Sequence, residues 1–464
     1  MNSEYYSTAE VANLAGIHKD TLLRWLRCGI VKEPNRDRHG WRFFLQSEAD
    51  EVIKLAKIPV PCPHFPEKSI NNRKPGLFKL SSINWDFENA KTSYLTHGIH
   101  PYPAKFIPQI PNTLIQELSG VGDTVGDIFC GSGTTLVESI ILKRHAVGID
   151  ANPLACLISK VKTTLISDDD VQDILSLSQR ARQFYVQLTN NYRKEPFKKY
   201  ISSAWRPSFA KLTFWFDLHI IEELAEILSW CRKIKNEAAK NIALTAFSSI
   251  IVAVSKQDSD TRYVRRDKNI LPGETTQRFC RALNQVTKSV MEFTKLAEPN
   301  FNCTIVEGNL LASPIIPKLD LVVCSPPYPN AYSYHLYHMT RMIWLEMDQQ
   351  KFKHEEIGSH RKYSSGGKNG ATSETFRREF GKIFMWLKQY LRKDGYACFV
   401  IGNSTIKGEI VDNANLLHES SCESGFREVM RINRNMQPTK KYFNPSIGKI
   451  KNENIVIFER TGKD

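Results

Sequence analysis

Residues 125–140 read Val-Gly-Asp-Ile-Phe-Cys-Gly-Ser-Gly-Thr-Thr-Leu-Val-Glu-Ser-Ile. This stretch predicts a short apolar strand, a tight turn at Gly131 and Gly133, and a helix, the order that opens a doubly wound α/β sheet. Glycine lets the backbone approach a ligand closely, and the start of the helix offers unpaired N–H groups. Strand-to-helix turns also need glycine for steric reasons alone, so the loop requires support from elsewhere in the chain.

A second strand gives that support. Residues 146–150 read Ala-Val-Gly-Ile-Asp, and they end in an acid about twenty residues after the loop, where such sheets bind the hydroxyls of a ribose. The loop lacks the third glycine of G-x-G-x-x-G, and no Walker lysine follows it, so dinucleotides and nucleoside triphosphates are disfavoured. S-adenosylmethionine (AdoMet), a nucleoside cofactor without phosphate, fits the loop better and is the expected cofactor.

A later strand ends in an unusual polar motif. Residues 321–328 read Leu-Val-Val-Cys-Ser-Pro-Pro-Tyr. The Ser325 hydroxyl and the Pro326 carbonyl are hydrogen-bond acceptors, two prolines remove backbone donors, and the Tyr328 ring can lie flat on a planar base. This set suits the holding of an exocyclic amino group while a methyl group arrives. The alternative is a Ser-Pro-Pro turn that only closes a buried strand.

A proline-restrained segment precedes the glycine loop. Residues 100–106 read His-Pro-Tyr-Pro-Ala-Lys-Phe, and we expect Lys105 and His100 to face a carboxylate. The alternative is a stiffened lead into the next helix.

Composition indicates the class of partner and the compartment. The 464 residues suffice for two or three domains, and the formal net charge of +14 favours a polyanionic partner, most simply nucleic acid. The ten cysteines contain no C-x-x-C pair, so neither a metal site nor a disulfide framework is expected. Reduced thiols, no apolar run of membrane length and no signal-peptide pattern predict a cytoplasmic protein without a membrane partner.

The first fifty-seven residues predict a small DNA-binding domain. Two short helices, near residues 8–15 and 18–27, precede a basic turn and an aromatic strand, the order of a helix-turn-helix with a wing. The segments Thr-Leu-Leu-Arg-Trp at 21–25 and Gly-Trp-Arg-Phe-Phe at 40–44 resemble the MerR-type winged-helix family, which implies DNA contacts by Arg24 and Arg42. Leu23 departs from the family, which usually has an arginine there. The alternative is a helical module that binds protein.

Three motifs in order, H-P-Y-P-A-K-F, D-x-F-x-G-S-G-T-T and S-P-P-Y, resemble the amino-group DNA methyltransferases of restriction–modification type. S-P-P-Y is the form typical of N4-cytosine enzymes. The resemblance implies a Rossmann-like seven-strand AdoMet-dependent methyltransferase sheet, double-stranded DNA as substrate and a cognate restriction endonuclease as a candidate partner. The catalytic residues that it implies are Ser325, Pro326, Pro327 and Tyr328. The cofactor residues that it implies are His100, Pro103, Ala104, Lys105, Phe106, Asp127, Phe129, Gly131, Gly133, Thr134, Asp150 and Asn309, the last in place of the family's acid.

The chemistry of the amine suggests the mechanism. Acceptors at Ser325 and Pro326 draw the amino nitrogen of a flipped base out of conjugation, so that it attacks the sulfonium methyl in line, with Tyr328 as the stacking platform. Aromatic and histidine side chains just after the motif suggest a pocket wall: Tyr332, Tyr334, His335, Tyr337 and His338. A C5-cytosine mechanism needs a Pro-Cys nucleophile beyond the loop, and the chain has Pro-Cys only at 61–62.

Other activities remain open. Adenine-N6 methylation uses the same geometry, an RNA guanine methylase is a third reading, and a DNA-binding regulator with an inactive methyltransferase domain is an alternative of another class.

The distance between the glycine loop and S-P-P-Y predicts an insertion that reads the DNA sequence. Its densest basic cluster contains Arg262, Arg265 and Arg266, and a second basic segment at 360–370 contains Arg361 and Lys362. A solvated loop between helices is the alternative for the first cluster. The whole chain thus predicts an α/β fold with a winged helix at 1–57, a proline-rich linker at 58–90, the AdoMet-binding half at 91–165, a helical insertion for target recognition at 166–299 and the catalytic half at 300–464. Neither the recognition sequence nor the oligomeric state follows from these patterns.

Overall fold

The computed structural model describes residues 5–16, 19, 22–23, 26, 31–37, 41–57, 75–88, 90–195, 199–330, 332–364, 370–435 and 452–462. The chain divides into two compact units, Met1–Arg73 and Lys74–Asp464, and each is described by itself.

The first unit has a small antiparallel sheet in the order β1-β3-β2. Val11, Phe44 and Val52 are buried in its core. Ser7 and Glu10 form a reciprocal capping box that starts the first helix. Arg24 and most of the predicted second helix lie outside the described residues. The elements are β1 (Tyr5–Ser7), α1 (Thr8–Leu14), β2 (Asn35–Arg36), β3 (Arg42–Leu45) and α3 (Gln46–Lys57).

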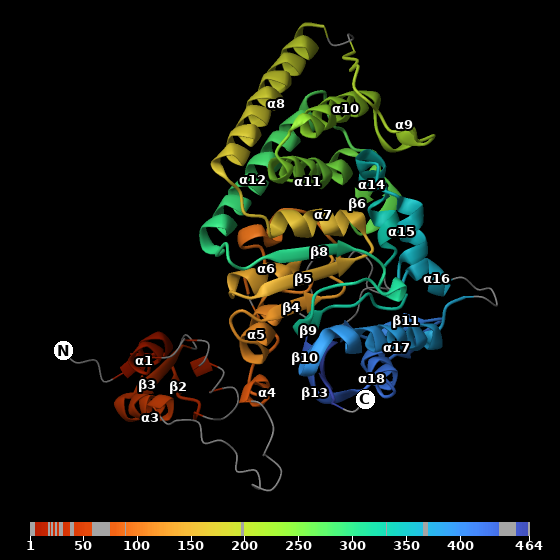
Figure 1. The fold of residues 1–464 in the computed structure, drawn as a ribbon. Helices are drawn as coiled ribbons and strands as arrows, with labels where there is room; N and C mark the ends of the chain where they lie inside the picture. The colour runs from red at the N-terminus through yellow and green to blue at the C-terminus, as the bar shows by residue number, and fades with distance from the viewer. Residues whose placement is uncertain are drawn as a thin grey trace. The chain divides into compact units, whose positions relative to one another are not determined.

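The second unit is built on a seven-stranded sheet in the order β13-β14-β10-β9-β4-β5-β8 (Figure 1). Five neighbouring strands, from β8 to β10, are parallel, and β14 runs antiparallel to both of its neighbours. The predicted α/β class and seven-strand sheet are therefore confirmed. The strands are β4 (Thr124–Asp127), β5 (His145–Asp150), β8 (Cys303–Glu307), β9 (Leu319–Cys324), β10 (Leu391–Gly402), β13 (Phe426–Asn435) and β14 (Asn452–Arg460).

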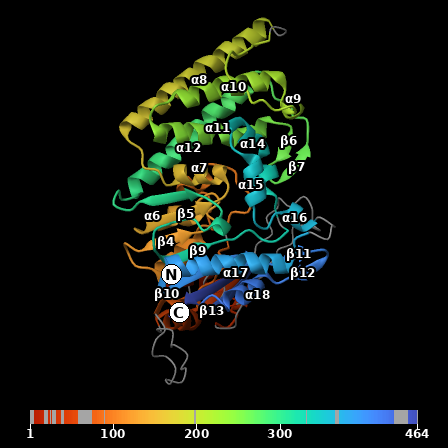
Figure 2. The same cartoon turned by 45° about the vertical axis from the view of Figure 1, so that its right-hand side comes forward.

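Consecutive residues of the central strands are apolar and point to opposite faces of the sheet, and both faces are buried. In β9, Leu321 and Val323 pack in a core with α4 (Pro75–Leu80) and α5 (Gln109–Leu118). Val322 and Cys324 pack in another core with α17 (Ser373–Tyr390) and α18 (Asn413–Ser421), the two helices that lie along the sheet in Figure 2. This is the burial expected of a parallel sheet covered on both sides.

The predicted linker at 58–90 is wrong in its second half. Leu77, Leu80 and Trp85 are buried in the core under α5, so residues 75–88 are part of the second unit. The several prolines of this region suggested a linker, but Pro75 stands at the first position of α4, where a missing N–H costs nothing.

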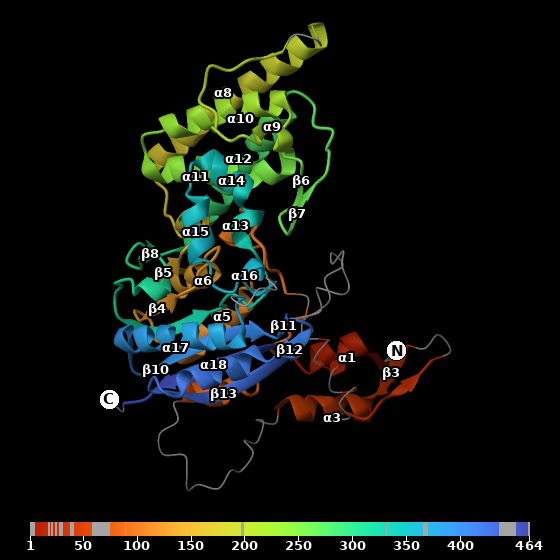
Figure 3. The same cartoon turned by 90° about the vertical axis from the view of Figure 1, so that its right-hand side faces the viewer.

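The predicted helical insertion is present between β5 and β8. Its helices share one large core and stack beyond α7, at the β8 end of the sheet (Figure 1). Figure 3 shows a short hairpin, β6–β7, extending from these helices. The elements from the glycine loop through the insertion are α6 (Thr134–Ile141), α7 (Pro153–Lys162), α8 (Asp168–Lys194), α9 (Leu212–Trp215), α10 (Leu218–Lys233), α11 (Glu237–Val254), β6 (Gln257–Ser259), β7 (Arg262–Arg265) and α12 (Glu274–Leu296).

One described helix, α11, is long and apolar enough to cross a membrane by length and composition, but 67% of it is buried inside the protein. Its apolar side chains belong to the core shared with α8, α10 and α12.

Short helices follow S-P-P-Y and surround its end of the sheet. These and the remaining short elements are η2 (Leu95–Gly98), η3 (Leu310–Ala312), α13 (Tyr334–Tyr337), α14 (Met339–Leu345), α15 (Gln349–Glu355), α16 (His360–Ser364), β11 (Ser404–Ile406) and β12 (Glu409–Val411).

Candidate functional site

A pocket lies at the carboxyl ends of β4, β5 and β9, the position where open α/β sheets bind ligands. It contains about 810 Å³ of space free of protein atoms, part of it open to solvent. Ten of the sixteen predicted catalytic and cofactor residues line it: Ala104, Lys105, Phe106, Phe129, Gly131, Thr134, Asp150, Asn309, Ser325 and Pro327. The structure thus brings the three separate motifs together around one cavity.

The glycine loop is held closely against the neighbouring strand and helix. Gly131 and Gly133 adopt φ of +49° and +76°, and a Cβ on Gly133 would lie 2.8 Å from the Ser159 hydroxyl. The Gly131 N–H donates to Asp150 Oδ2 at 2.8 Å. Burial raises the pKa of Asp150 to about 6, although the Asn152 and Gly131 N–H groups act against it. The glycine loop and Asp150 are therefore held together at the base of the pocket.

Asp127 lies beneath the loop rather than in the pocket lining. Its Oδ1 accepts from the Phe129 N–H at 3.2 Å, and burial raises the pKa of its carboxyl to about 7. Its role in this geometry is to hold the turn that presents Phe129.

Asn309 lines the pocket beyond β8, and its side-chain carbonyl oxygen makes a local hydrogen bond. Oδ1 accepts from the Leu311 N–H at 2.9 Å and caps η3. An amide oxygen has two lone pairs, so Oδ1 can still accept from an adenine amino group. The Asn309 NH₂ group is a donor for an adenine ring nitrogen.

Ser325 directly follows β9, and its hydroxyl hydrogen is engaged by the neighbouring strand. Its hydroxyl donates to the Val400 carbonyl on β10 at 3.0 Å. With this hydrogen engaged, the two lone pairs of the Ser325 oxygen can accept from a group in the pocket.

Tyr328 is held from behind by a buried ion pair. Its hydroxyl donates to Glu453 Oε1 at 2.9 Å, and Glu453 Oε2 lies 2.7 Å from Arg434 Nη1. Burial, followed by the Glu453 charge, raises the pKa of Tyr328 well above its ordinary value. The Tyr328 hydroxyl is therefore protonated, and its hydrogen bond to Glu453 fixes the orientation of the ring.

The other six predicted catalytic and cofactor residues lie outside the pocket lining: His100, Pro103, Asp127, Gly133, Pro326 and Tyr328. His100 differs most from expectation, because it does not face a carboxylate beside Lys105. It is buried, with Nδ1 donating to the Pro101 carbonyl at 2.7 Å and Nε2 facing the Ser248 hydroxyl at 3.0 Å. It holds residues 100–106 against α11 instead.

Several pocket residues were missing from the predicted site. Tyr102 lines the pocket and stacks on His338, with ring centroids 4.9 Å apart. Glu356, also in the lining, accepts from the Tyr334 N–H and from His335 Nδ1, both at 2.5 Å. The position of Tyr102 inside H-P-Y-P-A-K-F was a signal that was available in the sequence, whereas nothing in the sequence around Glu356 marks it. Of the expected aromatic wall, Tyr334 reaches the pocket directly.

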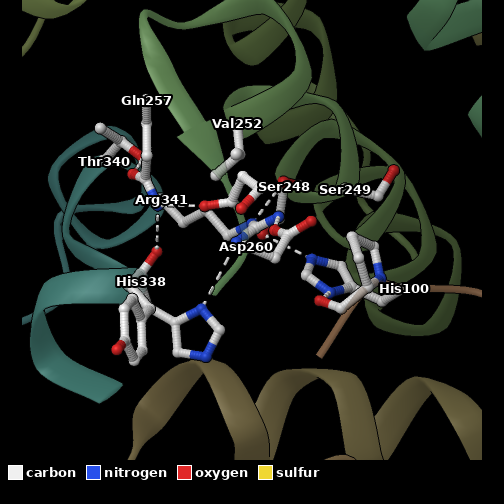
Figure 4. A network of polar contacts seen from close by, with 12 residues as sticks. His100, Ser248, Ser249, Val252, Gln257, Asp260, His338, Thr340 and Arg341 are labelled. Carbon is white, nitrogen blue, oxygen red and sulfur yellow. Dashed lines mark hydrogen bonds and ion pairs between the residues drawn. The ribbon is translucent and has the colours of Figure 1, made fainter. Parts of the chain in front are cut away.

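A buried arginine connects the hairpin of the insertion to the wall of the pocket (Figure 4). Arg341 is fully buried, forms an ion pair with Asp260 in the β6–β7 turn, and donates from Nε to the Ser248 carbonyl at 3.0 Å. Its Nη1 lies 3.4 Å from Nδ1 of His338, the ring that stacks on Tyr102. The hairpin is thereby fixed to the segment that follows S-P-P-Y.

The predicted DNA-binding arginines of the insertion lie on or next to that hairpin. Arg262 and Arg266 pair with Asp258 at 3.3 and 3.5 Å, and Arg265 pairs with Asp267 at 2.8 Å. All three remain substantially exposed, so they are accessible to phosphates.

The other predicted DNA-binding residues are dispersed. Arg361 and Lys362 lie on α16 of the second unit. Arg42 is in the first unit, where its Nε pairs with Glu33 at 2.7 Å.

Comparison with known proteins gives matches to DNA methyltransferases. A family model described as DNA methylase, N6_N4_Mtase, matches residues 36–161. The Type II methyltransferase M.MjaII of Methanocaldococcus jannaschii is 23% identical over 459 residues, covering 78% of this chain and 82% of that protein. M.MvaI of Kocuria varians is 28% identical over 281 residues, covering 56% and 60%. M.BglI of Bacillus subtilis is 36% identical over 100 residues, covering 19% and 27%.

Proposed function

We propose that this protein, a DNA methyltransferase of the Type II restriction–modification kind with AdoMet as its methyl donor, modifies the N4 amino group of cytosine. The observation that carries the choice of an exocyclic amine is the polarity of Ser325, whereas the choice of cytosine rests on the serine that begins the motif. Its hydrogen is engaged by the Val400 carbonyl, so its oxygen faces the pocket as an acceptor, which is what an exocyclic amine requires.

The pocket fits AdoMet through its own residues. Gly131 lines the pocket without a side chain, and Gly133 lets the loop pack closely against α7, where a Cβ would lie 2.8 Å from the Ser159 hydroxyl. In the proposed arrangement Asp150 holds the ribose and Asn309 meets the adenine, while Lys105 lies at the methionine end. AdoMet supplies a methyl group on a sulfonium, which is reactive toward a nitrogen lone pair.

Ser325 and the Pro326 carbonyl would accept the two amino hydrogens of the target. Hydrogen bonds directed away from the plane of the base weaken the conjugation of the nitrogen lone pair with the ring, so the transition state is bound more tightly than the ground state. No covalent bond to the protein forms, and the proton leaves after the methyl group has transferred. Tyr328, with its hydroxyl fixed by Glu453, would present its ring face to the flipped base.

Cytosine is favoured over adenine because the motif begins with serine, the form typical of the N4-cytosine enzymes that the chain resembles. Adenine-N6 methylation remains the second candidate, since the same acceptors hold either amine.

Recognition of double-stranded DNA is proposed for the helical insertion, with Arg262, Arg265 and Arg266 on its hairpin, and for Arg361 and Lys362 on α16. A further contact is proposed for the first unit through its winged-helix pattern and Arg42. A cognate restriction endonuclease as a partner and a cytoplasmic location are parts of the same proposal.

Mass spectrometry of nucleosides tests the assignment. The purified protein is incubated with AdoMet and unmethylated plasmid DNA, which is then digested, and N4-methylcytosine is the expected product. N6-methyladenine would contradict the cytosine assignment. No AdoMet binding in calorimetry and no methylated nucleoside, over a panel of DNA sequences, would instead support the inactive regulator.

A further inference from the structure

A fully buried lysine lies behind the glycine loop. Lys162, at the end of α7, has no exposed surface, and its Nζ donates to the Ser132 hydroxyl at 3.3 Å. An ammonium group has three N–H donors, and the described residues provide this one acceptor. Burial lowers the pKa of Lys162 well below its ordinary value, and the nearby charge of Lys105 adds to the effect.

Such a group is costly unless an anion compensates it. A buried ammonium without a counter-charge loses its hydration and gains little in return. Glu138 is the buried acid of this region, but its oxygens already accept from Tyr94, His97 and Asn112 at 2.6–2.7 Å. Among the described residues, Lys162 therefore has no carboxylate partner.

The pocket lies on the other side of Ser132. Ser132 and Lys105 both line it, as do Asp150 and Asn309 at the ends of β5 and β8. Because an acid at the end of this second strand binds ribose hydroxyls, the adenosine part of AdoMet belongs over β5 and β8. The cationic region around Lys105 and Lys162 is then left for the amino-acid part, which carries a carboxylate.

We propose that Lys162 is a positioning residue that binds the carboxylate of AdoMet through Ser132. The ammonium donates to the Ser132 oxygen, so the Ser132 hydrogen points into the pocket and donates to the carboxylate. The positive charge of Lys162 then has a counter-charge across one hydroxyl, and Lys105 supplies a second cation on the pocket surface. Ser132 and Ser325 thus have opposite polarity: a buried lysine makes the first a donor, and a buried carbonyl makes the second an acceptor.

This inference rests on AdoMet as the cofactor and is independent of which base is methylated. It is tested by calorimetric binding of two ligands, neither of which donates a methyl group. Sinefungin keeps the adenosine, amino and carboxylate groups of AdoMet, whereas 5′-deoxy-5′-methylthioadenosine lacks the amino-acid carboxylate. The substitution Lys162→Met retains most of the side-chain volume and removes the charge.

We expect Lys162→Met to bind sinefungin about 10- to 100-fold more weakly than the wild type, the range for hydrogen bonds to charged groups, and methylthioadenosine within about threefold of it. Lys160→Met is the matched control, because Lys160 lies on the same helix with its side chain 54% exposed and pairs with Glu237. It should change neither affinity. Ser132→Ala should reproduce the selective loss without opening a large cavity at α7.

Equal weakening of both ligands by Lys162→Met and by Ser132→Ala would overturn the inference, since the pair would then support the pocket only as packing. Unchanged sinefungin affinity in both variants would also overturn it. A failure of the wild type to bind methylthioadenosine would contradict the adenosine site itself, a result distinct from the wrong methylated base in the nucleoside assay.

Discussion

Replacing Ser325 by alanine tests the proposed chemistry most directly. The substitution removes the acceptor at the end of β9 and leaves the sheet and the glycine loop in place. Loss of one positioned hydrogen-bonding group at a reacting centre typically lowers kcat by about 10²- to 10³-fold, and we expect that range here. AdoMet affinity should stay within about threefold, because Asp150, Asn309 and the glycine loop remain.

The structure also predicts a small loss of stability. The Ser325 hydroxyl donates to Val400 at 3.0 Å, so Ser325→Ala removes one hydrogen bond worth about 1 kcal/mol of unfolding free energy. Ser420→Ala is the matched control: Ser420 is buried on α18 and donates to the Leu416 carbonyl at 2.6 Å, away from the pocket. It should lose similar stability and keep its activity.

Single-turnover transfer of labelled methyl groups to DNA measures the chemical step, and calorimetry with sinefungin measures cofactor binding. A single-turnover methyl-transfer rate for Ser325→Ala within about fivefold of the wild type is far less than the loss of a positioned acceptor produces, and it would refute the role of this hydroxyl. A loss of sinefungin affinity as large as the loss of methyl-transfer rate would indicate a collapsed pocket instead.

Three further perturbations follow from the same geometry. In urea unfolding, Gly133→Ala should lower the unfolding free energy by about 2–4 kcal/mol, because it adds a Cβ at positive φ within 2.8 Å of Ser159. Gly122 has a φ of +86° and open space around it, so Gly122→Ala should lose only about 1–2 kcal/mol in the same urea-unfolding assay. Tyr328→Phe should keep kcat within about fivefold of the wild type, since the ring remains. Tyr328→Ala should lose the base stacking, worth about 1–3 kcal/mol. An equal loss of kcat in both variants would assign the effect to the Tyr328 hydroxyl. Burial raises the pKa of Asp127 to about 7 from 3.8, so between these pH values the folded chain holds a proton that the unfolded chain has lost. The unfolding free energy of the wild type should therefore fall as pH rises from about 4 to 7. Asp127→Asn should remove this part of the fall, and an equal change in unfolding free energy between pH 5 and 8 for the wild type and the variant, measured by urea titration, would contradict it.

Local patterns in the sequence predicted the centre of the pocket well. The glycine loop, Asp150 and Ser325 each follow a strand of the same sheet, and parallel strands bring their carboxyl ends together, so short motifs sufficed to place them. The seven-strand sheet was implied by the resemblance to amino-group DNA methyltransferases, and the helical insertion was predicted from the long stretch between the glycine loop and S-P-P-Y.

The residues that hold these motifs were not predictable in the same way. Glu453 meets Tyr328 from 125 positions away, and Lys162 reaches Ser132 from the end of the helix after next. Such pairings depend on how helices pack on the sheet, which no local pattern encodes. His100 shows the reverse case: it belongs to a recognisable motif, yet packing turns it toward Ser248.

The position of β14 has a consequence for biosynthesis. This strand lies between β10 and β13 but follows both in the chain. On the ribosome, β10 and β13 therefore emerge without the partner that joins them, and Tyr328 emerges without Glu453. A nascent chain that already contains the glycine loop and S-P-P-Y still lacks the strand that fixes its tyrosine, so assembly of the active centre waits for residues 452–460.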